Sequence, residues 1–145
     1  MLFYLAPMEG ITGYIVRNAY AHYFPYIDKY FTPFIPAAKK MSKKIKRDLA
    51  AENNEQIRLV PQLIGNRADE FLMMIRQLEE LGFTSVNLNF GCPSGTVVSK
   101  RKGAGFLADP KELENLLEEV LENSPLAVSV KTRVGIKDPD EWEAL

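Results

Sequence analysis

This chain of 145 residues has only one cysteine and one histidine, and its formal net charge is close to zero. With one cysteine, Cys92, the chain can form no internal disulfide and no metal site built from several cysteines, and it suits a reducing compartment. The formal net charge of −1 excludes a general attraction to nucleic acid, although a local basic patch is compatible with it. The one histidine, His22, lies among aromatic residues, where we expect it to pack or to face solvent rather than to catalyse.

Long apolar runs are absent as well. No stretch approaches the length needed to cross a membrane, and residues 1–7 lack the charged start and long apolar core of a signal peptide. The composition, 46% hydrophobic and 26% charged, is ordinary for a globular protein. We therefore expect a soluble, cytoplasmic protein with no membrane partner.

Short β-prone segments alternate along the chain with segments that have helical periodicity. We expect strands at residues 2–6, 28–32, 58–64, 84–90 and 126–132, and helices after Thr12, at 42–51, at 68–81, from Pro110 and from Asp138. Thr12 is expected to cap the first helix, Gly82 to end the third, and the glycine-rich residues that follow Ser94 to form a loop. This alternation predicts an α/β fold with a parallel sheet.

Two architectures remain open at this point. An open doubly wound domain would fit the length. A (β/α)₈ TIM barrel needs roughly 250 residues, so the chain would supply only its N-terminal portion, about five β/α units. The sequence stops just as a helix starts, which favours the truncated barrel. Such a portion would expose apolar faces and an unpaired strand edge, through which copies could self-associate.

Cys92 stands where the fourth strand would end, in the stretch Asn-Leu-Asn-Phe-Gly-Cys-Pro-Ser that begins at Asn87. In parallel α/β folds, catalytic residues gather in the loops after strand C-termini. A lone cysteine is more often a buried structural residue. Here the flanking asparagines, Gly91 and Pro93 favour a functional thiol, as a nucleophile or a proton donor.

Three other strand ends carry candidate residues. Residues 6–12, Ala-Pro-Met-Glu-Gly-Ile-Thr, form either an ordinary turn or one that presses main-chain groups against a flat ligand. Gln62 lies inside an apolar strand, and its amide either serves a site or satisfies neighbouring backbone. Lys131 alternates with Val128 and Val130, which predicts that it faces away from them, towards a barrel interior or mouth.

Together these four segments resemble successive signatures of the tRNA-dihydrouridine synthases, in the right order and over essentially all 145 residues. The resemblance implies that residues 1–145 are part of an FMN-binding TIM-barrel catalytic domain, without its C-terminal strands and the helical tRNA-binding domain that follows. It also implies the activity: particular uridines of tRNA are reduced to 5,6-dihydrouridine, and NADPH or NADH recharges the flavin. No metal is implied.

The resemblance also assigns roles to individual residues. Pro7 and Met8 would contact the flavin ring through their backbone, and Gln62 would hydrogen-bond the isoalloxazine. Asn89 would lie near both the flavin and the target uracil. Lys131 would stabilise the negative charge of reduced FMN.

Cys92 would be the general acid, which protonates uracil C5 while hydride arrives at C6. Such proton transfer typically contributes ~10²–10⁴-fold to the rate. An ordinary thiol is protonated at neutral pH, as an acid requires, and no histidine base stands beside Cys92 in the sequence. Lys100, Arg101 and Lys102 would contact tRNA phosphates. A second basic run, at residues 39–47, is better explained as a solvated helix face.

Two departures from the family pattern affect the prediction. Phe31-Thr-Pro-Phe replaces the acidic residue that commonly follows the second strand, and the later strands that hold the FMN phosphate are not in this chain. We therefore expect the chain alone to be inactive and to bind flavin weakly. The alternatives are an FMN-dependent dihydroorotate dehydrogenase, which has a similar Asn-x-x-Cys-Pro segment, and a non-enzymatic RNA-binding or structural fragment. The form Asn-Phe-Gly-Cys-Pro-Ser and the Lys100 to Lys102 run favour the tRNA enzyme.

Overall fold

Short parallel strands alternate with helices in the computed structural model, which describes residues 1–136, 138, 140 and 141. The strands are β1 (Tyr4–Leu5), β2 (Lys29–Phe31), β3 (Ile35–Pro36), β4 (Leu59–Val60), β5 (Gln62–Ile64), β6 (Ser85–Asn89) and β7 (Ala127–Lys131). The helices are α1 (Tyr14–Tyr23), α2 (Lys43–Leu49), α3 (Ala68–Glu80), α4 (Gly95–Val98) and α5 (Pro110–Asn123), with 3₁₀ turns η1 (Ala51–Asn53) and η2 (Gly103–Ala108). The α/β prediction is confirmed. The helix expected from Asp138 includes Pro139 and Trp142, which lie outside the described residues.

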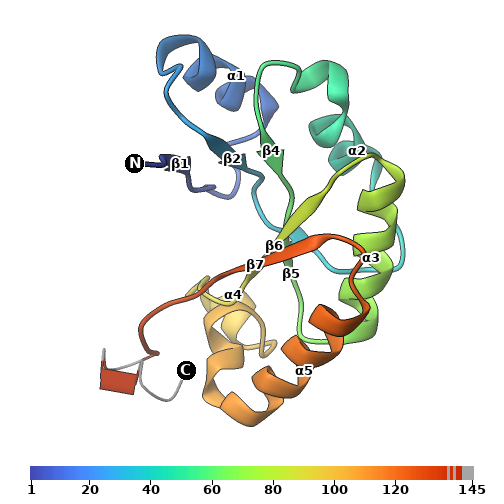
Figure 1. Cartoon of the computed structure of the whole chain (residues 1–145). Coiled ribbons are helices and arrows are strands. Elements are labelled where there is room, and N and C mark those ends of the chain that lie inside the picture. The colour runs from blue at the N-terminus through green and yellow to red at the C-terminus, as the bar shows by residue number, and fades with distance from the viewer. Residues whose placement is uncertain (137, 139, 142–145) are drawn as a thin grey trace.

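The strands follow one another in space in the same order as in the chain. One sheet has the order β1-β2-β4 and the other β3-β5-β6-β7, and every pairing is parallel. Since β3 closely follows β2, and β5 follows β4 after one residue, the two sheets continue each other without any reversal of order. Figure 1 shows helices α1, α2, α3 and α5 around the outside of an arc, with the strands inside it.

Prolines account for two differences between the expected and the observed strands. Residues 58–64 were expected to form one strand, but Pro61 separates β4 from β5 because it has no N–H to donate to the ladder. Across this break the Gln62 N–H donates to Thr32 Oγ1 over 2.9 Å instead of to a backbone carbonyl. Strand β3 was not predicted, since it ends in Pro36, yet Pro36 pairs with Ile64.

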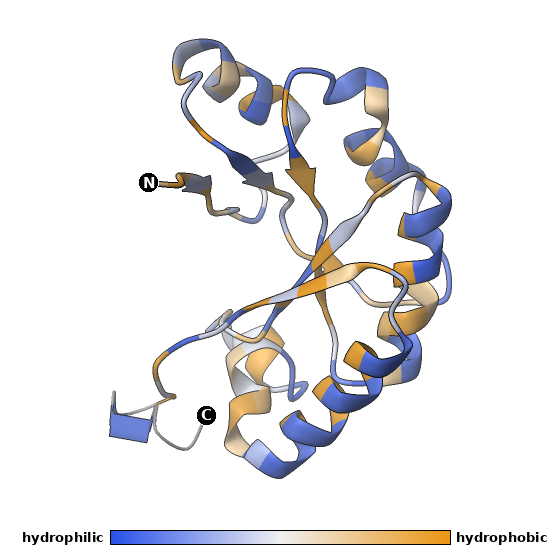
Figure 2. Cartoon of the chain, in the orientation of Figure 1, coloured by the Kyte–Doolittle hydropathy of each residue, from blue (hydrophilic) through white to orange (hydrophobic). Residues whose placement is uncertain are grey.

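The main hydrophobic core lies between the second sheet and helices α3 and α5. Alternate residues of β6, Val86 and Leu88, are fully buried in it. They meet the apolar stripes of the two helices, which consist of Phe71, Met74, Ile75 and Leu78 on α3 and Leu113, Leu116 and Val120 on α5. Figure 2 shows the same division in the helices, whose hydrophilic residues face outward. The odd-numbered side chains of β6 therefore face away from this core.

Helix boundaries confirm some predictions and correct others. Gly82, with φ of +87°, follows α3 as its stop, and Pro110 opens α5 with Asp109 as its cap. The prediction that Thr12 caps α1 was wrong: the cap position is Gly13, and the Thr12 hydroxyl bonds to Met8 instead. The expected loop after Ser94 contains the short helix α4 and the turn η2. None of the described helices is long and apolar enough to span a membrane.

Candidate active site at the strand ends

Polar side chains line the face of the second sheet that points away from the core. The register pairs Gln62 with Asn87, Asn87 with Ser129, and Asn89 with Lys131. Side chains two residues apart on a strand share a face, so all five lie on one side of β5, β6 and β7. We refer to Gln62, Asn87, Asn89, Ser129 and Lys131 as the strand-end cluster.

Side-chain amides in this cluster bond to one another. The Gln62 Nε2 donates to Asn87 Oδ1 and the Asn89 Nδ2 donates to Gln62 Oε1, both over 2.8 Å. The Asn87 Nδ2 donates to Ser129 Oγ over 2.9 Å. Gln62 is only 1% exposed, so an unpaired amide there would be costly. The partners of the Gln62 amide are thus side chains rather than the backbone considered from the sequence.

The turn that carries Cys92 is held from both sides. On one side, Asn89 Oδ1 accepts from the N–H of Gly91 over 3.0 Å and from the N–H of Cys92 over 2.9 Å. On the other, the Ala104 N–H donates to the Cys92 carbonyl over 3.0 Å. Gly103 has a left-handed φ of +53°, and a Cβ at this position would lie 2.7 Å from the Cys92 carbonyl oxygen. Gly103 was not predicted from the sequence, although the run Lys-Gly-Ala-Gly marks a place where backbone can approach closely.

Cys92 and Lys131 lie at the ends of neighbouring strands. Cys92 is a free, partly exposed cysteine, and its sulfur has no hydrogen bond with any residue that the structure describes. Lys131 is exposed and has no ion pair within the same described set. Val128 pairs with Val86 and packs against the core, so the prediction that Lys131 faces away from the valines is confirmed. A thiol and a cation therefore border the same polar face.

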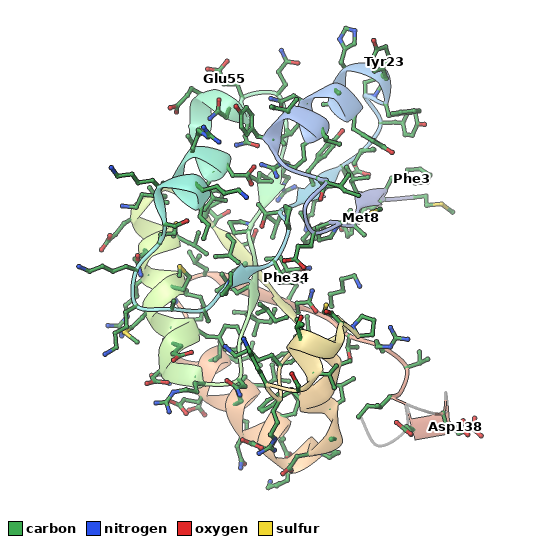
Figure 3. All side chains as sticks on the ribbon, turned by 180° about the vertical axis from the view of Figure 1, so that it is seen from behind. Phe3, Met8, Tyr23, Phe34, Glu55 and Asp138 are labelled. Atoms are coloured by element: carbon green, nitrogen blue, oxygen red, sulfur yellow. The ribbon has the colours of Figure 1, made fainter. Side chains whose placement is uncertain are left out.

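The turn after β1 is closed by its own hydrogen bonds. The Met8 N–H donates to Thr12 Oγ1 over 2.8 Å, and the Met8 carbonyl accepts from the N–H groups of Ile11 and Thr12. The backbone of Met8 is therefore already paired, whereas its side chain is 57% exposed. Figure 3 shows Met8 in the same region of the molecule as Phe34. The Met8 N–H and carbonyl are thus both used within this turn.

A buried arginine fixes this turn to helix α2. Arg17 is 0% exposed and donates to the carbonyl oxygens of Thr12 and Asp48, over 2.8 and 2.9 Å. It also contacts Asp48 Oδ2 over 3.1 Å and Asn54 Oδ1 over 3.0 Å. Burial lowers the pKa of Arg17 below its ordinary value, and the charge of Asp48 opposes this shift. No sequence signal distinguishes this arginine from one on a solvated helix face.

The basic run after Cys92 is divided in its contacts. Arg101 bonds to Glu112 and lies 3.7 Å from Asp109, so it is held against the start of α5. Lys100 and Lys102 have no ion pair with any other described residue.

His22 is exposed and meets the ring of Tyr23 edge-on at 4.8 Å, as expected for a surface residue.

Comparison with known proteins agrees with this arrangement. Residues 4–144 match the family described as "Dihydrouridine synthase (Dus)". The chain belongs to the dihydrouridine synthase family.

Several curated proteins that are similar to this chain are named as tRNA-dihydrouridine synthases. It is 31% identical over 144 residues to a "Probable tRNA-dihydrouridine synthase" of Staphylococcus epidermidis and to a "Probable tRNA-dihydrouridine synthase 2" of Bacillus subtilis. Each match covers 97% of this chain and 43% of the relative. It is 36% identical over 100 residues to a "tRNA-dihydrouridine(20/20a) synthase" of Vibrio parahaemolyticus, which covers 69% of this chain and 31% of that protein. The chain thus spans less than half the length of these relatives.

Proposed function

We propose that residues 1–145 form the N-terminal portion, about five β/α units, of a (β/α)₈ TIM barrel. A doubly wound sheet reverses its strand order at a switch point, whereas a barrel keeps chain order all the way round. The unreversed parallel order from β1 to β7, with helices α1, α2, α3 and α5 outside the arc, supports the barrel. The remaining strands and a helical tRNA-binding domain would belong to the further length that the relatives have.

The activity that we infer is the FMN-dependent reduction of specific tRNA uridines to 5,6-dihydrouridine, with NADPH or NADH as the reductant. The observation that carries this proposal is the bonded set in which Gln62 and Asn89 hold the Cys92 turn beside Lys131. The printed names of the relatives support the same substrate. Family membership also favours this reaction over the oxidation of dihydroorotate.

The residues at the strand ends fit a flavin ring. Each side-chain amide nitrogen carries two hydrogens, and Gln62 Nε2 and Asn89 Nδ2 each use one of them within the cluster. Each keeps one further hydrogen, but Gln62 is 1% and Asn89 6% exposed, so a ligand could accept that hydrogen only by packing directly against this face. Lys131, which has no ion pair among the residues that the structure describes, offers a cation for a reduced, anionic ring, and exposed Met8, next to Pro7, offers apolar contact.

Bound FMN would supply the hydride that reaches C6 of the uracil. Cys92 would then donate its thiol proton to C5, because the Asn89 carbonyl holds the Cys92 backbone at the edge of the polar face. Lys100 and Lys102 would hold tRNA phosphates beside this turn. Arg101 could join them only by leaving Glu112.

The test is Cys92→Ala in the protein that contains this chain, with Cys92→Ser as a matched variant of nearly the same size. We expect both to retain FMN absorbance and tRNA affinity and to lower the rate of dihydrouridine formation by at least ~10²-fold. Normal dihydrouridine formation by Cys92→Ala would exclude Cys92 as the acid. Reduction or oxidation of free orotate pyrimidines instead of tRNA would exclude the proposed substrate.

We also propose that this chain alone binds FMN weakly and self-associates through its open edges. Tyr4 of β1 is 49% exposed and Val130 of β7 is 44% exposed, so apolar side chains stand at both outer strands. Flavin absorbance after desalting and sedimentation at several concentrations test the two statements. A monomer that retains equimolar FMN would contradict both.

A further inference from the structure

A cavity of about 640 Å³ lies apart from the strand-end cluster. Its walls come from the turn before α1 and the first residues of that helix, from the segment that joins β2 to β3, and from helix α2. Neither Cys92 nor any member of the strand-end cluster lines it. Its volume is within the ~300–1,000 Å³ typical of small-ligand sites.

Two aromatic side chains and several aliphatic ones form the walls. Tyr14 and Phe34 both line the cavity, and both are half-buried. Ile11 and Ile15 are 54% and 69% exposed, which is unusual for isoleucine unless another group covers it. Such walls suit a flat, apolar-faced ligand that can stack on a ring.

Two cations stand at the same cavity. Lys44 and Arg47 are three residues apart on α2 and so share a helix face. Both are exposed, and neither has an ion pair in the part of the chain that the structure describes. Of the two acids on the cavity wall, Asp48 is already paired with buried Arg17, which leaves only Glu9 to oppose the two cations.

We propose that this cavity binds one unstacked nucleotide of RNA, with its base against Tyr14 and Phe34 and its phosphate against Lys44 and Arg47. Aromatic platforms beside basic residues are how single-stranded nucleic acid is generally bound. The inference rests on the proposed function in taking the RNA to be tRNA. Glu9 and Gly10, on the cavity wall, directly follow Pro7 and Met8 in the chain, so the bound nucleotide is one close to the reduced uridine.

The chain offers a matched control for the basic side chains. Lys43 and Lys46 lie on the same helix, are exposed and carry the same charge, but they do not line the cavity. The double variants Lys44→Ala/Arg47→Ala and Lys43→Ala/Lys46→Ala therefore remove equal charge from inside and outside the cavity. Phe34→Leu removes the ring and keeps an apolar side chain, and Phe34→Tyr keeps the ring.

The experiment measures the anisotropy of a fluorescein-labelled, eight-nucleotide single-stranded RNA with residues 1–145 and with each variant, at several salt concentrations. We expect Lys44→Ala/Arg47→Ala to reduce the slope of log K against log[salt] by about 0.7, since each neutralised phosphate on a single strand contributes about 0.7 and the proposed site holds one. We expect the Lys43/Lys46 pair to leave the slope unchanged. Phe34→Leu should raise Kd about 5-fold or more, and Phe34→Tyr should not.

The outcomes separate this inference from the proposed activity. Equal changes in the salt slope for the two double variants would overturn the inference. So would a Phe34→Leu variant that is folded by circular dichroism and binds the RNA with the wild-type Kd. Photo-crosslinks from 4-thiouridine RNA that fall only outside residues 9–16, 33–36 and 42–48 would also overturn it. The predicted pattern for residues 1–145, together with no dihydrouridine formation by the longer protein that contains them, would support the cavity while contradicting the proposed reaction.

Discussion

Removing the carboxylate of Asp48 should destabilise the chain more than any surface charge change. Arg17, its partner, is 0% exposed, whereas the Asp48 side chain is 24% exposed. Removal of one member of a buried ion pair costs about 3–5 kcal/mol, because the other charge stays buried and unpaired. The partial exposure of Asp48 lets water reach the site, which favours the lower end, about 3 kcal/mol.

Asp48 has a second role that adds to this loss. Its Oδ1 accepts from the Tyr14 N–H over 2.8 Å and so caps helix α1 from another helix. Loss of a cap costs about 1 kcal/mol, so Asp48→Ala should lower the free energy of unfolding by about 4 kcal/mol in total. Asp48→Asn retains an oxygen for Tyr14 and removes only the charge, and should lose less. Since domains are stable by about 5–15 kcal/mol, the difference is large enough to measure.

Urea unfolding followed by circular dichroism measures this free energy. The control is Glu114→Ala, which breaks the exposed pair between Lys111 and Glu114 and should leave the unfolding midpoint unchanged. A loss below about 1 kcal/mol for Asp48→Ala, or a loss no larger than that of the control, would refute the argument that Arg17 depends on Asp48.

Three further predictions concern other buried positions. Gln62→Leu leaves the amides of Asn87 and Asn89 each short of a partner and should lower the free energy of unfolding, measured with urea, by about 2–4 kcal/mol. An unchanged urea midpoint would show that these hydrogen bonds do not stabilise the fold. Gly103→Ala places a Cβ against the Cys92 carbonyl and should change the rate at which a disulfide reagent modifies Cys92, whereas an unchanged rate would show that the turn does not depend on Gly103. Burial raises the pKa of Tyr30, so the folded state favours its neutral phenol. The contribution of Tyr30 to the free energy of unfolding should therefore be constant below about pH 10 and should fall as the pH rises through the folded-state pKa. Tyr30→Phe should lack this component, and identical urea midpoints for both proteins at pH 8 and pH 11 would refute it.

The parts of the fold that the sequence predicted depend on local periodicity. The stripe of Phe71, Ile75 and Leu78 has helical spacing and forms α3 as expected. In the structure, the alternation around Val86 and Leu88 puts Asn87 and Asn89 on the other face of β6. Such patterns need only neighbours in the chain, because one buried face of a helix or strand determines the period.

The errors arise where a residue's partner is distant in the sequence. Pro61 breaks its strand, and the Gln62 N–H beside the break donates to Thr32 Oγ1, thirty residues earlier in the chain. Thr12 has the side chain of a helix cap, but α1 is capped by Asp48, which lies thirty-four residues from Tyr14. Neither partner can be inferred before the register of the strands and the packing of α2 are known.

The same limit explains what the sequence could and could not say about the site. It brought Gln62, Asn89, Cys92 and Lys131 to neighbouring strand ends, but it gave Asn89 only a ligand-binding role. In the structure the Asn89 carbonyl already accepts two N–H groups, from Gly91 and Cys92, so both of its lone pairs are used. Asn89 can therefore contact a ligand only through its one remaining amide hydrogen. Its carbonyl positions Cys92 by accepting from the N–H groups of Gly91 and Cys92, so a substitution that removes this acceptor should displace the thiol.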